Sequence, residues 1–217
     1  MLFRQMIEDK KVLLLGPASY LRDKKNNLSL DDYDVVVKIN KMVEKNVLQA
    51  PLDSRNEILY HCLDINIPNG DLPYDTEVWL SRGVKHLRIT HPPINAYYRS
   101  NIHRFSNIPQ DKKPTHSIVS GETFVWIKRE CKTSPNAGTI AIFDLLANGP
   151  SKLTIRGVTF CKTPYSDGYK EDIFYKKRTK SQHDHDKQLS FFAKFYKNNK
   201  QLLDIDEELK SIIGRYE

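Results

Sequence analysis

The chain is poor in the residues that mark several special classes of protein. Its 217 residues include only 3 cysteines, 9 glycines and 11 prolines, which excludes a disulfide scaffold, a collagen and a low-complexity chain. The longest apolar run near the start extends from Val12 to Leu15, far short of the roughly 18 residues that a membrane span needs. It is also too short for the apolar region of a secretory signal. We therefore expect a soluble, cytoplasmic protein whose Cys62, Cys131 and Cys161 are reduced.

Positive charge exceeds negative charge, with 34 Lys and Arg against 27 Asp and Glu and a net charge of +7. Such an excess is compatible with nucleic acid, an anionic membrane surface or an anionic small substrate. The basic residues are scattered along the chain, and no RNA-binding, zinc-finger or heptad pattern accompanies them. We therefore expect no nucleic-acid partner, whereas peripheral contact with an anionic membrane stays compatible with the charge.

Apolar runs and turn signals predict strands that alternate with helices. This alternation is typical of an α/β fold with a mostly parallel sheet. We expect a single Rossmann-like domain over residues 1–217, with a twisted sheet flanked by helices. Polar, proline-containing loops at 66–74 and 94–114 are expected to form lids or acceptor-side walls. The predicted strands cover 11–16, 34–40, 58–63, 78–80, 86–90, 117–119 and 153–160, and the predicted helices cover 137–146, 184–198 and 206–216.

Small and polar residues follow the first two predicted strands and open the first predicted helix. Ligands bind beyond the carboxyl ends of an open parallel sheet, and a helix N-terminus favours an anion. The sequence lacks GxGxxG, GxxxxGK[ST] and GxSxG, which excludes a dinucleotide fingerprint, a P-loop and a serine-hydrolase elbow. The candidate segments are Gly16-Pro17-Ala18-Ser19, Asn40 and the run from Ser134 to Thr139.

Two histidines, His183 and His185, stand at the start of the predicted helix 184–198. They could hold a metal ion, cap a solvated helix, or supply a general base. Residues two apart on a helix point about 200° apart, which argues against a shared ion. A helix N-terminus favours a neutral imidazole, which suits a base that starts unprotonated near pH 7.

Taken in order, these segments resemble the sialylmotifs of the sialyltransferases of glycosyltransferase family 29. The large motif corresponds to 12–19 with 30–40, the small motif to 134–139 with 153–158, and the very small motif to 183–188. The resemblance extends over residues 11 to 200. This chain has Lys38 where the family has Arg and Gln188 where it has Glu, and its first strand has no Cys for the disulfide of animal members. It resembles a compact bacterial or viral member without a membrane anchor.

The resemblance implies a CMP-sugar donor, a glycan or glycolipid acceptor, and an inverting transfer without a metal ion or other cofactor. In this interpretation His183 is the general base. Two alternatives stay open: a transferase of the related sugar Kdo, and a non-catalytic module that binds cytidine nucleotides, which Lys38 and Gln188 favour. A nucleic-acid binder and a metal hydrolase built on His183 and His185 are further alternatives. The implied donor-binding residues are Gly16, Pro17, Ala18, Ser19, Asn40, Ser134, Asn136, Ala137, Gly138, Thr139, Gly157, Tyr165 and Tyr169.

Overall fold

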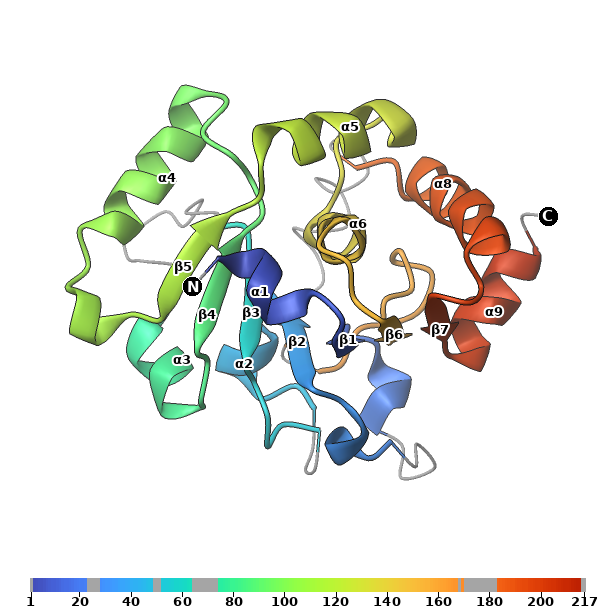
Figure 1. Ribbon diagram of the computed structural model, residues 1–217, viewed down its shortest axis with the longest axis horizontal. Coiled ribbons are helices and arrows are strands. Elements are labelled where there is room, and N and C mark those ends of the chain that lie inside the picture. The colour runs from blue at the N-terminus through green and yellow to red at the C-terminus, as the bar shows by residue number, and fades with distance from the viewer. Residues whose placement is uncertain are drawn as a thin grey trace.

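All strands of the described residues belong to one parallel sheet (Figure 1). The structure is a computed structural model, and it describes residues 2–22, 28–48, 52–63, 74–167, 169 and 183–215. The strand order is β5-β4-β3-β2-β1-β6-β7, and every neighbouring pair is parallel. The chain therefore has the predicted Rossmann-like α/β fold. The strands are β1 (Lys11–Leu15), β2 (Val35–Ile39), β3 (Ile58–His61), β4 (His86–Ile89), β5 (Thr115–Ile118), β6 (Lys152–Arg156) and β7 (Leu203–Ile205).

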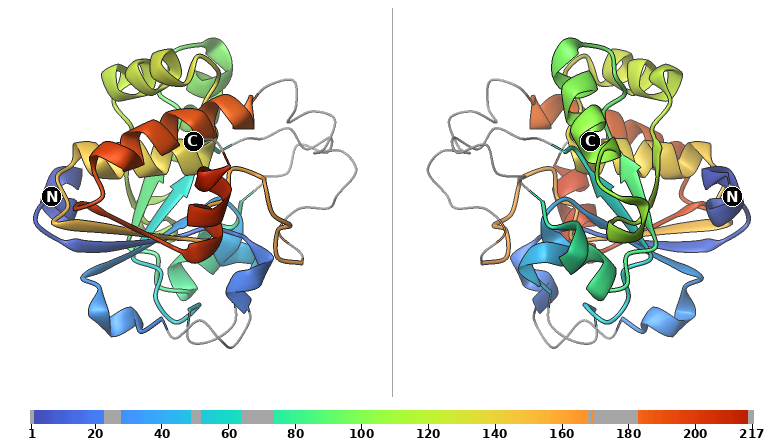
Figure 2. Two further views of the ribbon diagram at one scale, coloured as in Figure 1. Left: turned by 90° about the vertical axis from the view of Figure 1, so that its right-hand side faces the viewer. Right: turned by 90° about the vertical axis from the view of Figure 1, so that its left-hand side faces the viewer.

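Helices cover both faces of this sheet. Figures 1 and 2 show α5, α6 and α8 on one face and α2 and α3 on the other. Among the described residues, no helix is long and apolar enough to cross a membrane. The helices are α1 (Phe3–Ile7), α2 (Met42–Lys45), α3 (Thr76–Ser81), α4 (Ala96–Ser106), α5 (Gly121–Cys131), α6 (Ala137–Ala147), α8 (His185–Asn198) and α9 (Glu207–Gly214), with 3-10 turns η1 (Ser19–Arg22), η2 (Leu30–Asp32) and η3 (Gln110–Lys112).

The helix α6 is the central helix of its layer. Every residue from Ala137 to Leu145 is buried, because α6 lies between β2 and β3 on one side and α5 on the other. Phe143 of α6 also stacks on Phe191 of α8, with ring centroids 4.5 Å apart. A helix that is buried on all sides belongs in a core, so the position of its N-terminus is fixed by packing.

Two sequence predictions about secondary structure are wrong. The segment 78–80, predicted as a strand, lies in α3, because Asp75 caps that helix by accepting a hydrogen bond from Val78 N at 3.0 Å. The segment 94–114, predicted as a polar loop, contains α4 and η3. Asn95 caps α4 by accepting from Tyr98 N, and the buried Asn101 and Phe105 lie one turn apart on its inner side. Residues 66–73 of the other predicted loop lie outside the described residues.

Other boundaries differ by less, and some elements were not predicted. The strand predicted at 153–160 ends at Arg156, because Gly157, Phe160 and Cys161 all have positive φ angles. The helix α5 and the edge strand β7 were missed. The predicted strands at 11–16, 34–40, 58–63, 86–90 and 117–119 and the helices at 137–146, 184–198 and 206–216 are confirmed within a few residues.

A buried ion pair joins the sheet to α6. Arg88 on β4 donates two hydrogen bonds to Asp144 on α6, at 2.8 and 2.9 Å, and Tyr60 on β3 donates a third at 2.8 Å. The remaining Arg88 nitrogen donates to Ser117 Oγ and Ile118 O. The carboxylate and the guanidinium are both almost wholly buried, so each depends on the other for its solvation.

Beside this pair lies His86, whose two ring nitrogens bond to Thr115 Oγ1 and Ser117 Oγ. Burial, and after it the charge of Arg88, lowers the pKa of His86 from 6.5 to about 4. The unfolded chain therefore takes up this proton first, and stability is expected to fall between pH 6.5 and pH 4, by about 3 kcal/mol in total. Urea unfolding at pH 7 and pH 4.5 measures the loss. His86→Gln should reduce it by about 2 kcal/mol, and an equal loss in the variant would contradict the assignment.

Candidate active site

The strand order reverses at β1, which sets where a ligand crevice is expected in an open sheet. From β1 the chain builds β2 to β5 on one side and then returns to place β6 and β7 on the other. All strands are parallel, so their carboxyl ends meet at one edge. The carboxyl ends of β1 and β6 therefore flank the point where ligands bind in open α/β sheets.

At this point the two chain segments touch backbone to backbone. Gly16 N donates to Arg156 O at 2.7 Å, and Ala18 N donates to Gly157 O at 3.3 Å. A Cβ atom on Gly16 would lie 2.2 Å from Gly157 O, and Gly157 itself has a φ of +73°. Both glycines are therefore required by the close approach, since neither position has room for a side chain without a shift of the backbone.

This contact changes the role predicted for the segment after β1. Ser19 N donates to Pro164 O at 3.1 Å, and Pro17 has no N–H group but accepts from Ser166 N at 2.7 Å. The N–H groups of Gly16, Ala18 and Ser19 are thus already bonded within the protein. What this segment can offer to a ligand is its surface and the half-buried hydroxyl of Ser19.

Asn40 directly follows β2 at the same edge. Its φ is +48°, a left-handed conformation that asparagine tolerates better than most residues. Its backbone N–H donates to Tyr60 O, and its Oδ1 accepts from Cys62 N at 3.3 Å. Among the described residues its Nδ2 group has no acceptor, so this amide is available as a donor at the edge of the sheet.

The N-terminus of α6 supplies a site for an anion. Asn136 caps the helix by accepting from Thr139 N at 2.9 Å. In the described part of the chain, the N–H groups of Ala137 and Gly138 have no acceptor. A Cβ on Gly138 would lie 3.2 Å from Val158 and 3.6 Å from Ile39, so this helix end meets both β2 and the segment after β6. Two unpaired N–H groups at a helix N-terminus bind an anion well.

His183 is held beside this helix end. Its Nδ1 lies 2.9 Å from the carbonyl oxygen of Ser134, two residues before the cap of α6. A carbonyl only accepts, so Nδ1 carries the proton and Nε2 carries the lone pair. Asp184 anchors the same segment, because its N–H donates to Thr133 Oγ1 and its carboxylate caps α8 at Lys187 N. The imidazole thus has the tautomer and the support that a general base needs.

The two tyrosines from the segment after β6 lie next to the β1 segment. Ala18 and Tyr165 form an isolated antiparallel bridge, and the Tyr165 and Tyr169 rings make an edge contact at 5.2 Å. The Tyr165 hydroxyl lies 2.6 Å from the sulfur of Cys161. Burial raises the pKa of Tyr165, so its phenol stays protonated and can donate.

The structure thus brings the predicted residues together in two groups. The first contains Gly16, Pro17, Ala18, Ser19, Gly157, Tyr165 and Tyr169, and the second contains Ser134, Asn136, Ala137, Gly138, Thr139 and His183. Gly138 links them through Val158, and Lys162 links them through an ion pair with Asp186 on α8. Asn40 follows Ile39, whose side chain lies near Gly138.

Lys38, where the family has Arg, lies one residue before the end of β2. Its ammonium group donates to Asp53 at 2.8 Å, and its side chain is wholly buried. Burial lowers the pKa of Lys38. Its position and its partner give this residue a structural role, which the sequence pattern alone did not indicate.

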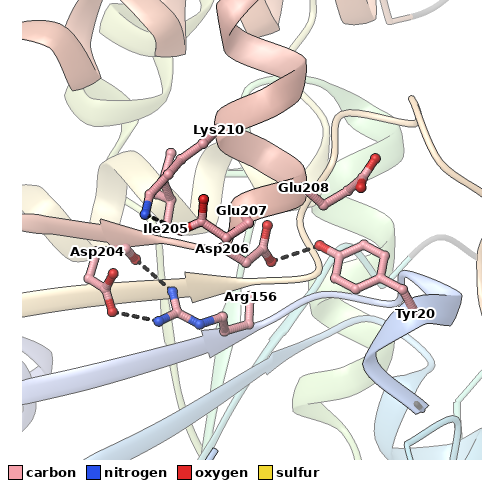
Figure 3. A pocket seen from close by; sticks show the side chains of 8 residues that line it. All are labelled: Tyr20, Arg156, Asp204, Ile205, Asp206, Glu207, Glu208 and Lys210. Carbon is pink, nitrogen blue, oxygen red and sulfur yellow. Dashed lines mark hydrogen bonds and ion pairs between the residues drawn. The ribbon is translucent and has the colours of Figure 1, made fainter. Parts of the chain in front are cut away.

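A second feature missed from the sequence is Asp206, the cap of α9. One of its carboxylate oxygens accepts from Tyr20 Oη at 2.7 Å and from Gly157 N at 2.8 Å, and the other accepts from Leu209 N at 2.8 Å. Asp206 and Tyr20 line an open cavity of about 380 Å³, and Figure 3 shows their side chains pointing toward each other. Four of the charged groups around them form two ion pairs, Arg156 with Asp204 and Lys210 with Glu207.

The histidine pair does not extend to a metal site within the described residues. The rings of His183 and His185 are 6.2 Å apart between centroids. Across the described ranges, no group of three or more His, Cys, Asp or Glu side chains is placed to hold an ion. The prediction of a metal-independent reaction is not tested by this observation.

Comparison with known proteins identifies relatives of the fold. No family model matches the sequence, and no curated protein matches it. A sialyltransferase CstII variant in complex with CMP has 13% identity and a TM-score of 0.61, covering 90% of this chain and 80% of that one. Campylobacter jejuni CstII in complex with the substrate analogue CMP-3FNeuAc has 12% identity and a TM-score of 0.57, over 92% and 87%. A mammalian sialyltransferase has 14% identity and a TM-score of 0.56, over 92% and 69%. This chain therefore has the fold of these sialyltransferases.

Proposed function

We propose that this protein is a glycosyltransferase that moves a sialic-acid-like sugar from a CMP-sugar donor to a glycan hydroxyl. The observation that carries the proposal is His183, held through Nδ1 by the Ser134 carbonyl beside the open N-terminus of α6. Transfer from an anionic donor requires a base close to an anion site. The fold shared with sialyltransferases, two of them in complex with CMP or CMP-3FNeuAc, supports the same conclusion.

The donor is proposed to occupy the crevice between the ends of β1 and β6. Ser19, Asn40 and Tyr165 would offer a hydroxyl, an amide and a phenol to the nucleotide and its phosphate. The N–H groups of Ala137 and Gly138 would receive an anionic group of the donor, either the phosphate or the sugar carboxylate. Gly16 and Gly157 would contribute shape instead of hydrogen-bond donors, because the N–H of Gly16 bonds to Arg156 O and that of Gly157 bonds to Asp206.

The proposed reaction is a single displacement with inversion at the anomeric carbon. Nε2 of His183 takes the proton from the acceptor hydroxyl as the new carbon–oxygen bond forms. The bond from the anomeric carbon to the phosphate oxygen breaks, and its electron pair leaves with CMP. Hydrogen bonds to the phosphate would stabilise this leaving group without a divalent ion. Afterwards the imidazolium returns its proton to solvent.

The acceptor is proposed to approach beside α4. This helix follows β4, so its first turn lies at the same edge of the sheet as the crevice. Ile94 and Tyr97 are exposed there, at 50% and 38% of their surface. An exposed aromatic ring suits the apolar face of a sugar, and the exposed Arg99 on the same helix is compatible with an anionic glycolipid or membrane surface. The sugar of the donor, sialic acid or Kdo, stays open.

Thermal unfolding with and without nucleotides tests the donor. In EDTA, CMP is expected to raise the Tm, and UMP, AMP and GMP are expected to leave it unchanged, because a ligand that binds only the folded state stabilises it by mass action. At one hundred times the Kd the gain is about 2.7 kcal/mol. Transfer from CMP-sialic acid and CMP-Kdo then follows. No shift with CMP, or a larger shift with a purine nucleotide, would overturn the cytidine donor.

A further inference from the structure

The side chain of Gln188 on α8 is wholly buried against the N-terminus of α6. Its Oε1 accepts from Asn136 N at 3.1 Å and from Thr139 Oγ1 at 2.6 Å. Its Nε2 lies 3.4 Å from the carbonyl oxygen of Ser134, a long hydrogen bond. One amide therefore spans the connection that leads into α6 and the first turn of that helix.

The orientation of this amide follows from its partners. The N–H of Asn136 can only donate, so the atom facing it must be the oxygen, and the nitrogen is turned toward Ser134. The same Ser134 oxygen accepts from His183 Nδ1. A glutamate here would place a second carboxylate oxygen against that carbonyl oxygen, where neither atom has a proton to donate. An amide fits both ends of this site, and an ionised carboxylate fits one.

We propose that Gln188 is a positioning residue for His183. Its neutral amide holds the Ser134 carbonyl in place. The carbonyl oxygen then accepts from Nδ1 of His183 and so fixes the tautomer of that ring. The absence of a charge on the amide also lets the imidazole remain a neutral base to lower pH than a glutamate would allow. The role of His183 as base rests on the proposed function, but its tautomer and its pKa can be measured without a substrate.

The other charged groups near His183 are already partnered among the described residues. Asp184 caps α8 and pairs with Lys187, and Asp186 pairs with Lys162 from the segment after β6. His185 is the nearest ionisable ring. A substitution at Gln188 does not remove any of these groups, so the change that it causes in the pKa of His183 is assigned to residue 188 and its own bonds.

NMR titration of ¹⁵N-labelled histidine rings tests the proposal. In Gln188→Glu the pKa of His183 is expected to rise by about one unit, because an opposite charge nearby favours the imidazolium. The acid limb of log kcat/KM should move up by the same amount, an effect that a loss of stability would not produce. Asn198→Asp is the matched control: it makes the same amide-to-carboxylate change about 15 Å further along α8, and it should leave the pKa unchanged.

Equal His183 pKa values in the wild type and Gln188→Glu would overturn the proposal. The wild-type protein gives a second test that does not depend on the folding of a variant. A protonated Nδ1 at neutral pH supports the proposal, and a protonated Nε2 overturns it. If the pKa shifts but no CMP-sugar is turned over, the positioning role stands and the proposed function fails. If CMP-sugar is transferred but the pKa of His183 is the same in Gln188→Glu, the proposed function stands and the positioning role fails.

Discussion

His183→Ala is expected to lower kcat/KM for transfer from the CMP-sugar by about 10²- to 10⁴-fold, the usual contribution of a general base. The imidazole is the group that would accept the acceptor's proton, and the Ser134 carbonyl orients it for that step. The variant should bind CMP with little change, because the proposed donor contacts come from other residues. Initial rates across a range of donor concentrations, with a thermal melt of each sample, measure both effects.

His185→Ala is the matched control for this result. His185 has the same side chain two residues further on, and its ring lies 6.2 Å from that of His183. Its loss is expected to change kcat/KM by less than about tenfold, because it is not bonded to the Ser134 carbonyl. Equal losses in the two variants, together with sensitivity to EDTA, would favour the metal interpretation of this pair. A His183→Ala variant that keeps the full rate would contradict the role of His183 as general base.

Asp144→Ala should destabilise the fold by about 3–5 kcal/mol, which is a large share of the stability of a domain of this size. The substitution leaves the guanidinium of Arg88 buried without its carboxylate partner and also removes the acceptor of Tyr60. Equilibrium unfolding in urea measures the loss, and a variant found only in the insoluble fraction agrees with it.

Two comparisons show whether the buried charge causes this loss. Asp204→Ala removes an ion pair with Arg156 that is partly exposed, and it should change stability by less than about 1 kcal/mol. The double variant Arg88→Met with Asp144→Leu removes both charges and should recover part of the stability that Asp144→Ala loses. A double variant less stable than Asp144→Ala would contradict this explanation.

The sequence predicts those parts of the fold that local patterns determine. Val12 to Leu15 is continuously apolar and is a central strand, and the stretch after Asn136 is rich in apolar residues and is a buried helix. The sequence predicts a strand at Trp79, but the apolar run there covers only three positions. Three positions are too few to distinguish the two-residue period of a strand from the 3.6-residue period of a helix. The helix is decided by the Asp75 cap and by the packing of Trp79 on Tyr74.

The sequence predicts which residues of the candidate site lie near one another, but it does not predict the hydrogen bonds between them. The order of motifs indicated which residues gather at the sheet edge. It could not indicate that the N–H groups of Gly16, Ala18 and Ser19 would bond to the β6 side, since that partner lies more than 130 residues away. Gln188 departs from the sialylmotif pattern, which has Glu at this position. Its buried contacts with Asn136 and Thr139 give it a structural reason.

The carboxylate of Asp206 makes the shape of the crevice depend on the last helix of the chain. It joins the first turn of α9 to Gly157, and Gly157 in turn sets the backbone of Gly16 and Ala18. Shortening the protein before residue 206 would therefore remove a support of the proposed nucleotide site, although no residue of α9 need touch the nucleotide. A fusion partner is better attached after α9. Among random deletion variants, those that keep activity should rarely have lost residues of this helix.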